Sequence, residues 1–363
     1  MSDASLKRLL ETYDSRVAPQ MFLHSMGVAP AENFYKGDSI ERDFLRQSKA
    51  VSYPLPKGET GYHLNQSTKY TNKSYTGIPY KEATPINAEE ITKRQPGQIN
   101  FSDPQTAIVA TKIAFKAMQN MEDMMRRAME IQAAQVMLTG KISLKDPAGT
   151  VVYAEDFKPK STHFVTVNTL WSNSGATIIA DIDALVKVII NDGGLVPDQI
   201  ITDSETIETI LGNAAIQKRL DLRNVELGSL GLRAPNGQGG VYHGQLVVGA
   251  YRLDLWSYGA TYVDVTTGLE TQYIPKGKVI VKNHASRFDC TYGAYARLVP
   301  IDQRVLSFLP GAFGGMGGTS SNFGFSANAW TDQTGENVHV GIATKFLFIP
   351  TAIDTYGCLT VLS

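Results

Sequence analysis

Cysteine is scarce in this sequence. Only Cys290 and Cys358 occur among 363 residues, so a disulfide framework does not hold the chain together, and a reducing compartment is the default expectation. Long apolar runs are also lacking, because the richest stretch, residues 178–190, is interrupted by charged side chains. The first residues carry both charge signs and no apolar core, which argues against a signal peptide. The sequence therefore predicts neither membrane insertion nor secretion.

Charge of one sign is not in excess. The chain has 34 Lys and Arg residues against 35 Asp and Glu residues, a formal net charge of -1. No whole-protein field therefore attracts a polyanion such as nucleic acid, which leaves only a local basic patch for that role. With 43% hydrophobic residues the composition is that of a globular protein, and the length allows two or three domains of roughly 100–200 residues each.

Catalytic and metal-binding signatures are missing as well. The six histidines never fall at His-x-x-x-His spacing, and neither cysteine has a cysteine partner nearby in sequence. Segment 139–142 ends like a phosphate-binding loop, but Gln135 stands where its first glycine belongs and Ile142 where its hydroxyl residue belongs. The glycine-rich segment 314–318 matches no dinucleotide fingerprint, and no Gly-x-Ser-x-Gly elbow exists. We therefore predict no enzyme activity and no catalytic, cofactor-binding or metal site.

The first hundred residues have the composition and residue spacing of an extended arm. Residues 5–16 have the spacing of a short helix, but residues 17–101 show no sustained helical period and contain seven prolines. A stretch of this length is too long for an ordinary connection and too aromatic for a disordered tail. We expect it to be ordered only where it meets another surface.

Tyrosines and lysines gather at residues 53–81 of this arm, with Glu59 as the lone acid. One interpretation is a basic, aromatic surface that stacks bases and follows phosphates. The other is a two-stranded hairpin whose tyrosines lie on a neighbouring protein, because an isolated hairpin is marginal in water. The near-neutral total charge favours the protein neighbour. The residues are Tyr53, Tyr62, Tyr70, Tyr75, Tyr80, Lys57, Lys69, Lys73 and Lys81.

A long helix is the clearest element of the sequence. Asp103 suits its N-cap, Pro104 suits its first position, and no helix-breaking residue follows until Gly140. A continuous helix over residues 103–139 would be roughly 55 Å long at about 1.5 Å per residue. Its methionines are more typical of a core stripe than of a promiscuous binding groove. The face expected to be buried comprises Val109, Ile113, Ala117, Met121, Met124, Ala128 and Ile131.

Shorter helices and strands follow. Residues 150–153 and 163–167 read as two antiparallel strands after a turn at 145–149. A helix at 178–190 ends in Asp192-Gly193-Gly194, and a strand at 199–202 leads to Asp203, which is placed to cap a helix from Ser204. Residues 311–318 read as a flexible glycine-rich loop. Further strands are expected at 246–248, 251–256, 261–265, 279–281, 338–342, 345–349 and 358–362.

These features point to a subunit of an assembly. The chain has no visible active site, an unsupported arm and an overlong helix, and the arm must find its buried surface on neighbours.

The sequence also resembles the lambda-like major capsid proteins of tailed bacteriophages, the capsid E family, over essentially its whole length. Order and spacing, rather than any one residue, make the likeness specific. It is carried by QNMEDMMRRAMEIQAAQVMLTGK (119–141), IPKGKVIVKN (274–283), NAWT (328–331) and KFLFIPTAID (345–354).

The resemblance implies an α+β protein with the Hong Kong 97-type (HK97-like) capsid fold. Residues 1–34 would be an N-terminal arm, and residues 35–101 would hold an extended hairpin loop (E-loop). Residues 102–167, with return strands at 330–349, would form the peripheral (P) domain around the long spine helix. Residues 168–329, with a C-terminal strand at 350–363, would form the axial (A) domain.

The resemblance also implies a structural function. A major capsid protein self-assembles as a homo-oligomer into pentamers and hexamers, which close the icosahedral shell of a tailed phage around packaged double-stranded DNA. The partners implied are further copies, a portal protein, a decoration or cement protein, and DNA on the inner face without sequence specificity. Because this chain reaches its arm within the first dozens of residues, we expect a separate scaffolding protein. The location implied is the virion, and the host cytoplasm during assembly, with no membrane partner.

Some relatives join a hairpin lysine to an asparagine of a neighbour. Lys57, Lys69, Lys73 or Lys81 and Asn322 or Asn328 are residues of the right types. The lambda-like group relies on non-covalent contacts, so we do not expect cross-links here. Two alternative functions stay open: a nucleic-acid-binding protein that uses the 53–81 hairpin, and a nanocompartment shell of the same fold.

Overall fold

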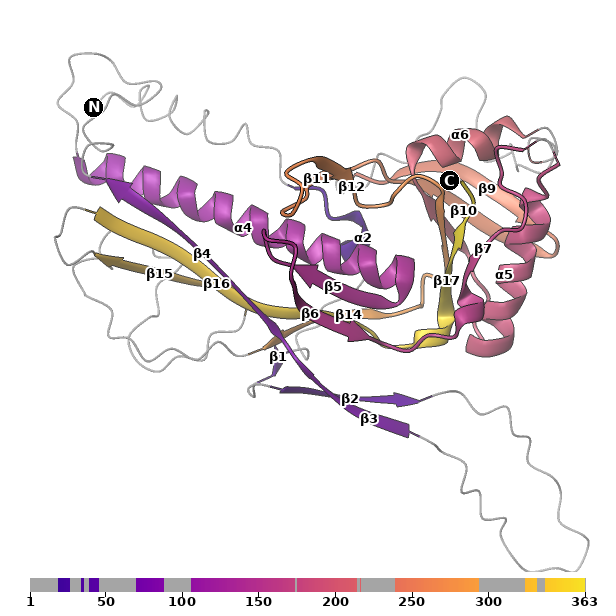
Figure 1. Cartoon of the computed structure of the whole chain (residues 1–363), viewed down its shortest axis with the longest axis horizontal. Coiled ribbons are helices and arrows are strands. Elements are labelled where there is room, and N and C mark those ends of the chain that lie inside the picture. The colour runs from indigo at the N-terminus through magenta and orange to yellow at the C-terminus, as the bar shows by residue number, and fades with distance from the viewer. Residues whose placement is uncertain are drawn as a thin grey trace, which may run out of the picture.

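Two bodies lie side by side in the computed structural model, one with a long helix along a sheet and one with two shorter helices on a second sheet (Figure 1). The helix expected at 5–16 and the glycine-rich loop expected at 311–318 fall outside the described residues. The structure describes residues 19–26, 34–35, 39–45, 70–87, 106–173, 175–213, 216, 239–293, 324–331 and 337–362.

Helix α4 (Thr106–Thr139) is the long helix that the sequence predicts, and it runs for 34 residues. Its expected N-cap, Asp103, lies outside the described residues. Its end is the predicted one, because Gly140 has a φ of 67° and donates its backbone N–H to the Val136 carbonyl at 2.8 Å. Glycine adopts this left-handed conformation without the steric cost that a Cβ would bring.

The buried face of α4 differs from the predicted one. Met118, Met121 and Met125 are at most 3% exposed, whereas Met124, which belongs to the predicted stripe, is 49% exposed. Apolar residues occupy two adjacent faces of this helix, so its period does not tell which face turns inward. The sheet beneath the helix selects the face. The interpretation of the helix methionines as core is wrong for Met124 and confirmed for the other five. These are Met118, Met121, Met125, Met129 and Met137.

A five-stranded sheet carries α4, and its central strand is β16 (Asn337–Pro350). This is one continuous strand where the sequence predicts two. It pairs antiparallel with β4 (Ile78–Asn87), β14 (Phe288–Gly293) and β15 (Ser326–Thr331), and β1 (Phe34–Tyr35) lies parallel to β14. The Gln132 side chain of α4 accepts the Phe348 backbone N–H and donates to the Tyr80 hydroxyl, both at 3.0 Å. Helix and sheet are thus joined by hydrogen bonds as well as by apolar packing.

A six-stranded sheet forms the second body. Helices α5 (Ile178–Gly193) and α6 (Ser204–Gly212) lie on it, in the order α5, β8, α6 that the sequence predicts. The strands, in spatial order, are β7 (Phe164–Thr166), β17 (Tyr356–Thr360), β13 (Lys278–Lys282), β8 (Gln199–Thr202), β10 (Tyr251–Ser257) and β9 (Val241–Val248).

Alternation along β13 shows how the two bodies share a core. Val279 and Val281 point into the cluster beneath α5 and α6, whereas Ile280 points into the cluster shared with α4 and β16. Successive side chains of a strand face opposite sides, so one strand serves both cores. The two bodies are therefore packed against each other through a common apolar layer.

The predicted helix ends of this second body are confirmed. The Asp203 carboxylate accepts the backbone N–H groups of Glu205 and Thr206, each at 3.0 Å, at the start of α6. Gly194 has a φ of 68° and closes α5 by donating its N–H to the Ile190 carbonyl at 3.1 Å. Both contacts satisfy backbone groups that a helix end leaves unpaired.

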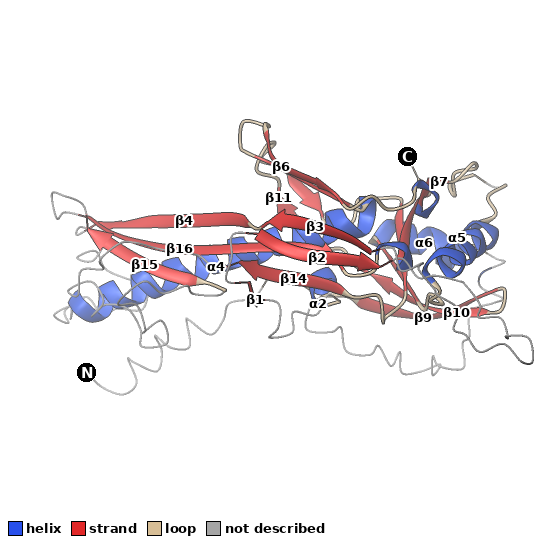
Figure 2. Ribbon diagram, turned by 90° about the horizontal axis from the view of Figure 1, so that it is seen from below, coloured by secondary structure: helices blue, strands red, loops and turns tan. Residues whose placement is uncertain are grey.

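Three hairpins extend from these bodies (Figure 2). Strands β2 (Ser39–Leu45) and β3 (Tyr70–Thr76) form the base of the segment expected to be the E-loop. Strands β5 (Lys141–Lys145) and β6 (Val151–Asp156) follow α4, and β11 (Thr261–Val263) pairs with β12 (Glu270–Gln272). Short helices complete the described elements: α2 (Phe22–Ser25), Ser161–His163 and Ile353–Thr355.

Several strand predictions are corrected. The expected pairing of 150–153 with 163–167 is wrong, because β6 pairs with β5 and β7 lies parallel to β17. Strand β5 was missed since its lysines gave it no continuous apolar pattern, and β14 was missed since an acid stands among its buried residues. The strand expected at 261–265 ends at Val263, where Asp264 turns the chain by accepting the N–H groups of Thr266 and Thr267.

Sheet membership also differs from the expected domain boundaries. Strand β7 belongs to the six-stranded sheet although it was expected in the peripheral segment 102–167. Strands β14 and most of β15 belong to the five-stranded sheet although they were expected within 168–329. Strand pairing over long sequence separations decides which sheet a strand joins, and the local sequence does not predict that pairing.

None of the described helices is long and apolar enough to cross a membrane.

Replacing the α6 cap tests its contribution to stability. Asp203→Ala removes the acceptor for the Glu205 and Thr206 N–H groups at the helix start, and for the Gly277 N–H at 3.3 Å. We expect the free energy of unfolding to fall by about 1–2 kcal/mol. Asp203→Asn keeps an acceptor oxygen and should lose less than half of that. Denaturant unfolding of the three proteins measures the difference, and equal stability of the Ala and Asn variants would contradict the capping role.

Candidate assembly surfaces

Part of the expected N-terminal arm lies on its own chain. Phe22 and Leu23 of α2 are fully buried, and the Phe22 ring centroid lies 5.6 Å from that of Trp256 and 5.3 Å from that of Tyr258. A Cβ on Gly240 would come within 2.2 Å of the Phe22 ring, so only glycine leaves room for it. We call residues 19–26 the arm segment. Residues 1–18 fall outside the described part of the chain, so their place along a neighbour stays a prediction.

A buried carboxylate holds the arm segment to α4. Glu130 is fully buried, and its two carboxylate oxygens accept the backbone N–H groups of Leu23 and His24, each at 2.8 Å. Burial raises the pKa of Glu130 to about 7, although both N–H groups act in the opposite direction. The Tyr258 hydroxyl donates to the Gln20 carbonyl at 3.2 Å, which adds a third polar contact to the same segment.

A buried amine lies under the other end of the arm segment. Lys282 of β13 is 1% exposed, and its Nζ donates to the Met26 Sδ at 3.9 Å. The same Nζ lies 5.6 Å from the centroid of the Phe288 ring. Burial lowers the pKa of Lys282 to about 8, against the opposing charge of Asp198. Sequence reasoning passed over both Glu130 and Lys282. The only signal for Glu130 was its place between buried residues of the helical stripe.

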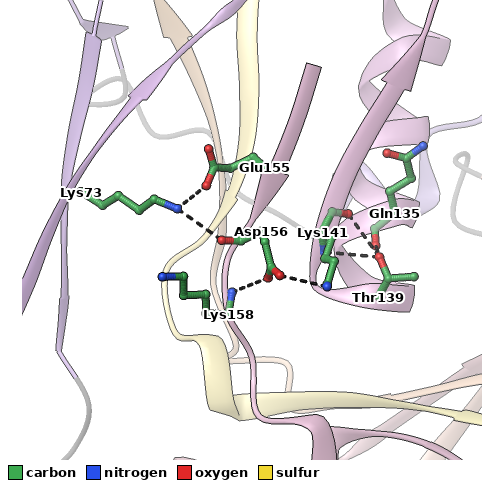
Figure 3. A network of polar contacts seen from close by, with 7 residues as sticks. All are labelled: Lys73, Gln135, Thr139, Lys141, Glu155, Asp156 and Lys158. Atoms are coloured by element: carbon green, nitrogen blue, oxygen red, sulfur yellow. Dashed lines mark hydrogen bonds and ion pairs between the residues drawn. The ribbon is translucent and has the colours of Figure 1, made fainter. Parts of the chain in front are cut away.

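Polar contacts fix the base of the β2–β3 hairpin (Figure 3). Lys73 of β3 donates to the Glu155 carboxylate and, at 3.3 Å, to the Asp156 carbonyl of β6. The Asp156 carboxylate accepts Lys141 Nζ at 2.9 Å and the Lys158 backbone N–H at 2.7 Å. Burial would raise the pKa of Asp156, but these donors outweigh it and hold the pKa below its ordinary value.

The end of α4 joins the same network. The Gln135 side chain exchanges two hydrogen bonds with the Ser143 backbone, at 3.0 and 2.8 Å. The Thr139 hydroxyl donates to the Gln135 carbonyl at 2.8 Å (Figure 3). The Tyr75 ring packs against Phe157 with centroids 5.6 Å apart. Strand β3, the β5–β6 hairpin and the helix end are thus held as one unit.

Two tyrosines of the 53–81 segment face the chain's own core. Tyr75 is 2% exposed, and the Tyr80 ring stacks on Phe346 with centroids 4.5 Å apart. Neither presents a ring face for stacking bases. Tyr53 and Tyr62 fall outside the described residues.

The cross-link candidates are spread over the fold. Lys73 is engaged with Glu155 of its own chain, and Lys81 is exposed on β4. The backbone of Asn328 lies opposite Gly341 within the five-stranded sheet. Lys57, Lys69 and Asn322 fall outside the described residues.

Exposed apolar side chains gather where two hairpins touch. A Cβ on Gly149, in the β5–β6 turn, would lie 3.4 Å from the Thr266 Cγ2 in the β11–β12 turn. Five of the nine large apolar side chains that are exposed in the described part of the chain lie on these two hairpins, so exposure is concentrated and not scattered. We call this the paired-hairpin tip, and Figure 2 shows β6 and β11 standing out from one side of the molecule. Its apolar residues are Val151, Val152, Val263, Val265 and Leu269.

The β11–β12 turn is held by its own carboxylate. The backbone N–H of Thr266 donates to Asp264 at 2.7 Å, and this contact, with the charge of Lys145 in β5, holds the pKa of Asp264 below its ordinary value. A group of three or more metal-ligating side chains is absent from the described residues. The expectation of no catalytic, cofactor or metal site stays a prediction.

Solved structures share this fold. A protein assigned as the capsid protein of a prophage in Escherichia coli CFT073 is 16% identical, with a TM-score of 0.59 over 95% of this chain and 89% of that one. A chain from Gordonia phage Cozz is 11% identical, with a TM-score of 0.50 over 96% of this chain and 89% of that one. An encapsulin complex from Synechococcus elongatus PCC 7942 is 10% identical with a TM-score of 0.47, covering 96% of this chain and 89% of that one. The HK97-like phage capsid fold expected from the sequence is thereby confirmed.

No curated protein sequence matches the chain. A family model does, and it extends over nearly the whole length. The model is that of phage major capsid protein E, it matches residues 5–355, and the chain belongs to this family of capsid proteins that build phage shells from identical subunits.

Proposed function

We propose that this chain forms the pentamers and hexamers of an icosahedral phage head around double-stranded DNA. The observation that carries the proposal is the paired-hairpin tip, whose apolar side chains are exposed on the single chain. Soluble proteins that act alone rarely collect exposed apolar residues in one place. A neighbouring copy that covers the tip would remove this surface from water.

The free energy of one such contact is modest, which is what the assembly of a closed shell requires. Burying one valine or leucine side chain contributes about 1.5–3 kcal/mol, so each tip adds a modest amount to an interface. A subunit in a closed shell meets several neighbours at once, and its contacts then act together. Weak single contacts allow misplaced subunits to leave before the shell closes.

The β2–β3 hairpin supports the same proposal. Its base is fixed to β6 through Lys73, and its outermost described pair joins Leu45 to Tyr70. A two-stranded hairpin is marginal on its own and needs a surface to pack against. Together with the buried ring of Tyr75 and the stacked ring of Tyr80, this favours a protein neighbour over nucleic acid as the surface that the 53–81 segment meets.

The remaining partners are part of the proposal. A separate scaffolding protein would guide assembly in the host cytoplasm, a portal would occupy one vertex, and a decoration protein would bind the finished shell. DNA would lie against the inner face without sequence specificity, in keeping with the net charge of -1. Family membership favours the phage head over a nanocompartment shell of the same fold.

Polar substitutions at the paired-hairpin tip should impair assembly without unfolding the subunit. We expect Val152→Ser combined with Leu269→Ser to lower the yield of shells roughly tenfold at fixed concentration, with an unchanged thermal midpoint of the free subunit. Sedimentation and negative-stain microscopy measure the yield. The control is Val196→Ser, an exposed valine outside the tip. Normal shell yield from the double variant would remove the carrying observation.

Breaking the ion pair at the hairpin base should loosen the E-loop. The Lys73 and Glu155 side chains are 35% and 20% exposed, so the pair contributes only about 0.5–1 kcal/mol. Lys73→Met should therefore raise the hydrogen-exchange rate of residues 70–76 by roughly threefold. Exchanging the two charges, with Lys73→Glu and Glu155→Lys together, should recover part of the protection. An unchanged rate in the single variant would show that the pair does not hold the hairpin.

Shells of this chain should contain no covalent links between subunits. Lys73 is held by Glu155 and Asp156 of its own chain, and this occupies one of the four candidate lysines. Boiled shells should therefore run as a single band of monomer size in denaturing electrophoresis. A ladder of higher bands that survives reducing agent would overturn the expectation and call for mapping of the linked lysine and asparagine.

A further inference from the structure

The arm segment covers two buried groups of opposite charge. Its Leu23 and His24 backbone N–H groups meet the Glu130 carboxylate, and its Met26 side chain meets the Lys282 amine. Both groups are at most 1% exposed, and they belong to different bodies of the fold, α4 and β13. The same eight residues therefore keep an acid and an amine away from water.

We propose that the arm segment is a releasable latch, which holds the N-terminal arm on its own subunit and docks more firmly in alkaline solution than near neutral pH. The inference rests on the proposed function, in which an arm must become available to a neighbour as the shell forms. Opening the latch returns both buried groups to water, where each takes its charged form. The gain in solvation of these two charges opposes the apolar packing of Phe22 and Leu23.

The acid makes docking weaker as pH rises. Burial raises the pKa of Glu130 from 4.5 to about 7. A raised pKa means that the docked state binds the proton more tightly than the open state does. The stabilisation of docking is therefore complete below pH 4.5 and is lost as pH rises through about 7.

The amine makes docking weaker as pH falls. Burial lowers the pKa of Lys282 from 10.5 to about 8. Here the docked state binds the proton less tightly, so the stabilisation is complete above pH 10.5 and is lost as pH falls through about 8. The two dependences have opposite signs.

One more group of the arm segment changes its pKa on opening. Burial and the neighbouring Arg126 lower the pKa of His24 from 6.5 to about 4, so its stabilisation of docking is complete above pH 6.5 and is lost as pH falls towards about 4. This dependence opposes that of Glu130 over the same interval, and the two largely cancel. Burial raises the pKa of the Tyr258 and Tyr273 hydroxyls, which both face Glu130 and stay protonated. Arg127 acts on Tyr273 as a fixed positive charge, and Asp198 is the acid that faces Lys282. The net pH dependence of the latch is thus set by Lys282, with Glu130 and His24 in balance.

Hydrogen exchange of the full chain, kept dilute so that it stays unassembled, tests the latch directly. The measured quantity is the protection factor of residues 21–26, corrected for the intrinsic pH dependence of amide exchange. We expect protection at about pH 9.5 to be roughly tenfold higher than at about pH 7.5, with little change between about pH 5.5 and about pH 7.5. Residues 204–212 of α6, capped by Asp203, serve as the internal control and should show a flat profile.

Two variants separate the contributions to the profile. Glu130→Gln leaves the His24 dependence unopposed, so protection should rise roughly tenfold between about pH 5.5 and about pH 7.5. Lys282→Met replaces the amine by an apolar side chain of similar length, so protection should no longer rise above about pH 8. If one variant fails to fold, the other still changes its own part of the profile.

Protection that does not rise between about pH 7.5 and about pH 9.5 in the unmodified protein, or variants with the unmodified profile, would overturn the latch. The proposed function is tested separately, by whether the same chain sediments as shells when concentrated or supplied with its head partners. Shells without a pH-dependent arm would refute the latch alone. A pH-dependent arm in a chain that never assembles would refute the shell and leave the latch standing.

Discussion

The packing of α4 on β16 is the contact on which the rest of the structure depends. Strand β16 pairs with β4, β14 and β15, and Gln132 of α4 reaches both the Phe348 backbone and the Tyr80 hydroxyl. Glutamine is 0% exposed here, so its amide must be satisfied within the protein, and this fixes the helix at one position along the sheet. The hairpin base, the arm segment and the second body all pack against this frame.

The frame leaves surfaces that one chain does not cover. The paired-hairpin tip exposes apolar side chains, and the β2–β3 hairpin leads away from the core, whereas the arm segment is held close by Glu130 and Lys282. These three features differ in kind, because the first two call for a neighbour and the third controls when a neighbour meets the arm. The chain belongs to the phage major capsid protein E family, whose members build shells from identical subunits. Assembly into such a shell accounts for all three features.

Sequence reasoning succeeded where local chemistry decides the structure and failed where distant segments decide it. The extent of α4, the Asp203 cap and the stop at Gly194 follow from neighbouring residues, and the structure confirms them. The buried face of α4, the pairing of β6 and the continuity of β16 depend on strands far away in sequence. Glu130 and Lys282 were missed for the same reason, since a charged residue reads as surface until the arm segment is seen to cover it.

The central claim is that this chain is complete only among copies of itself. Analytical ultracentrifugation with electron microscopy of the purified full chain, alone and with its head partners, tests it most directly. The account predicts closed shells with five-fold and six-fold clusters of one subunit. A folded particle that stays monomeric at every concentration and with every head partner would contradict it.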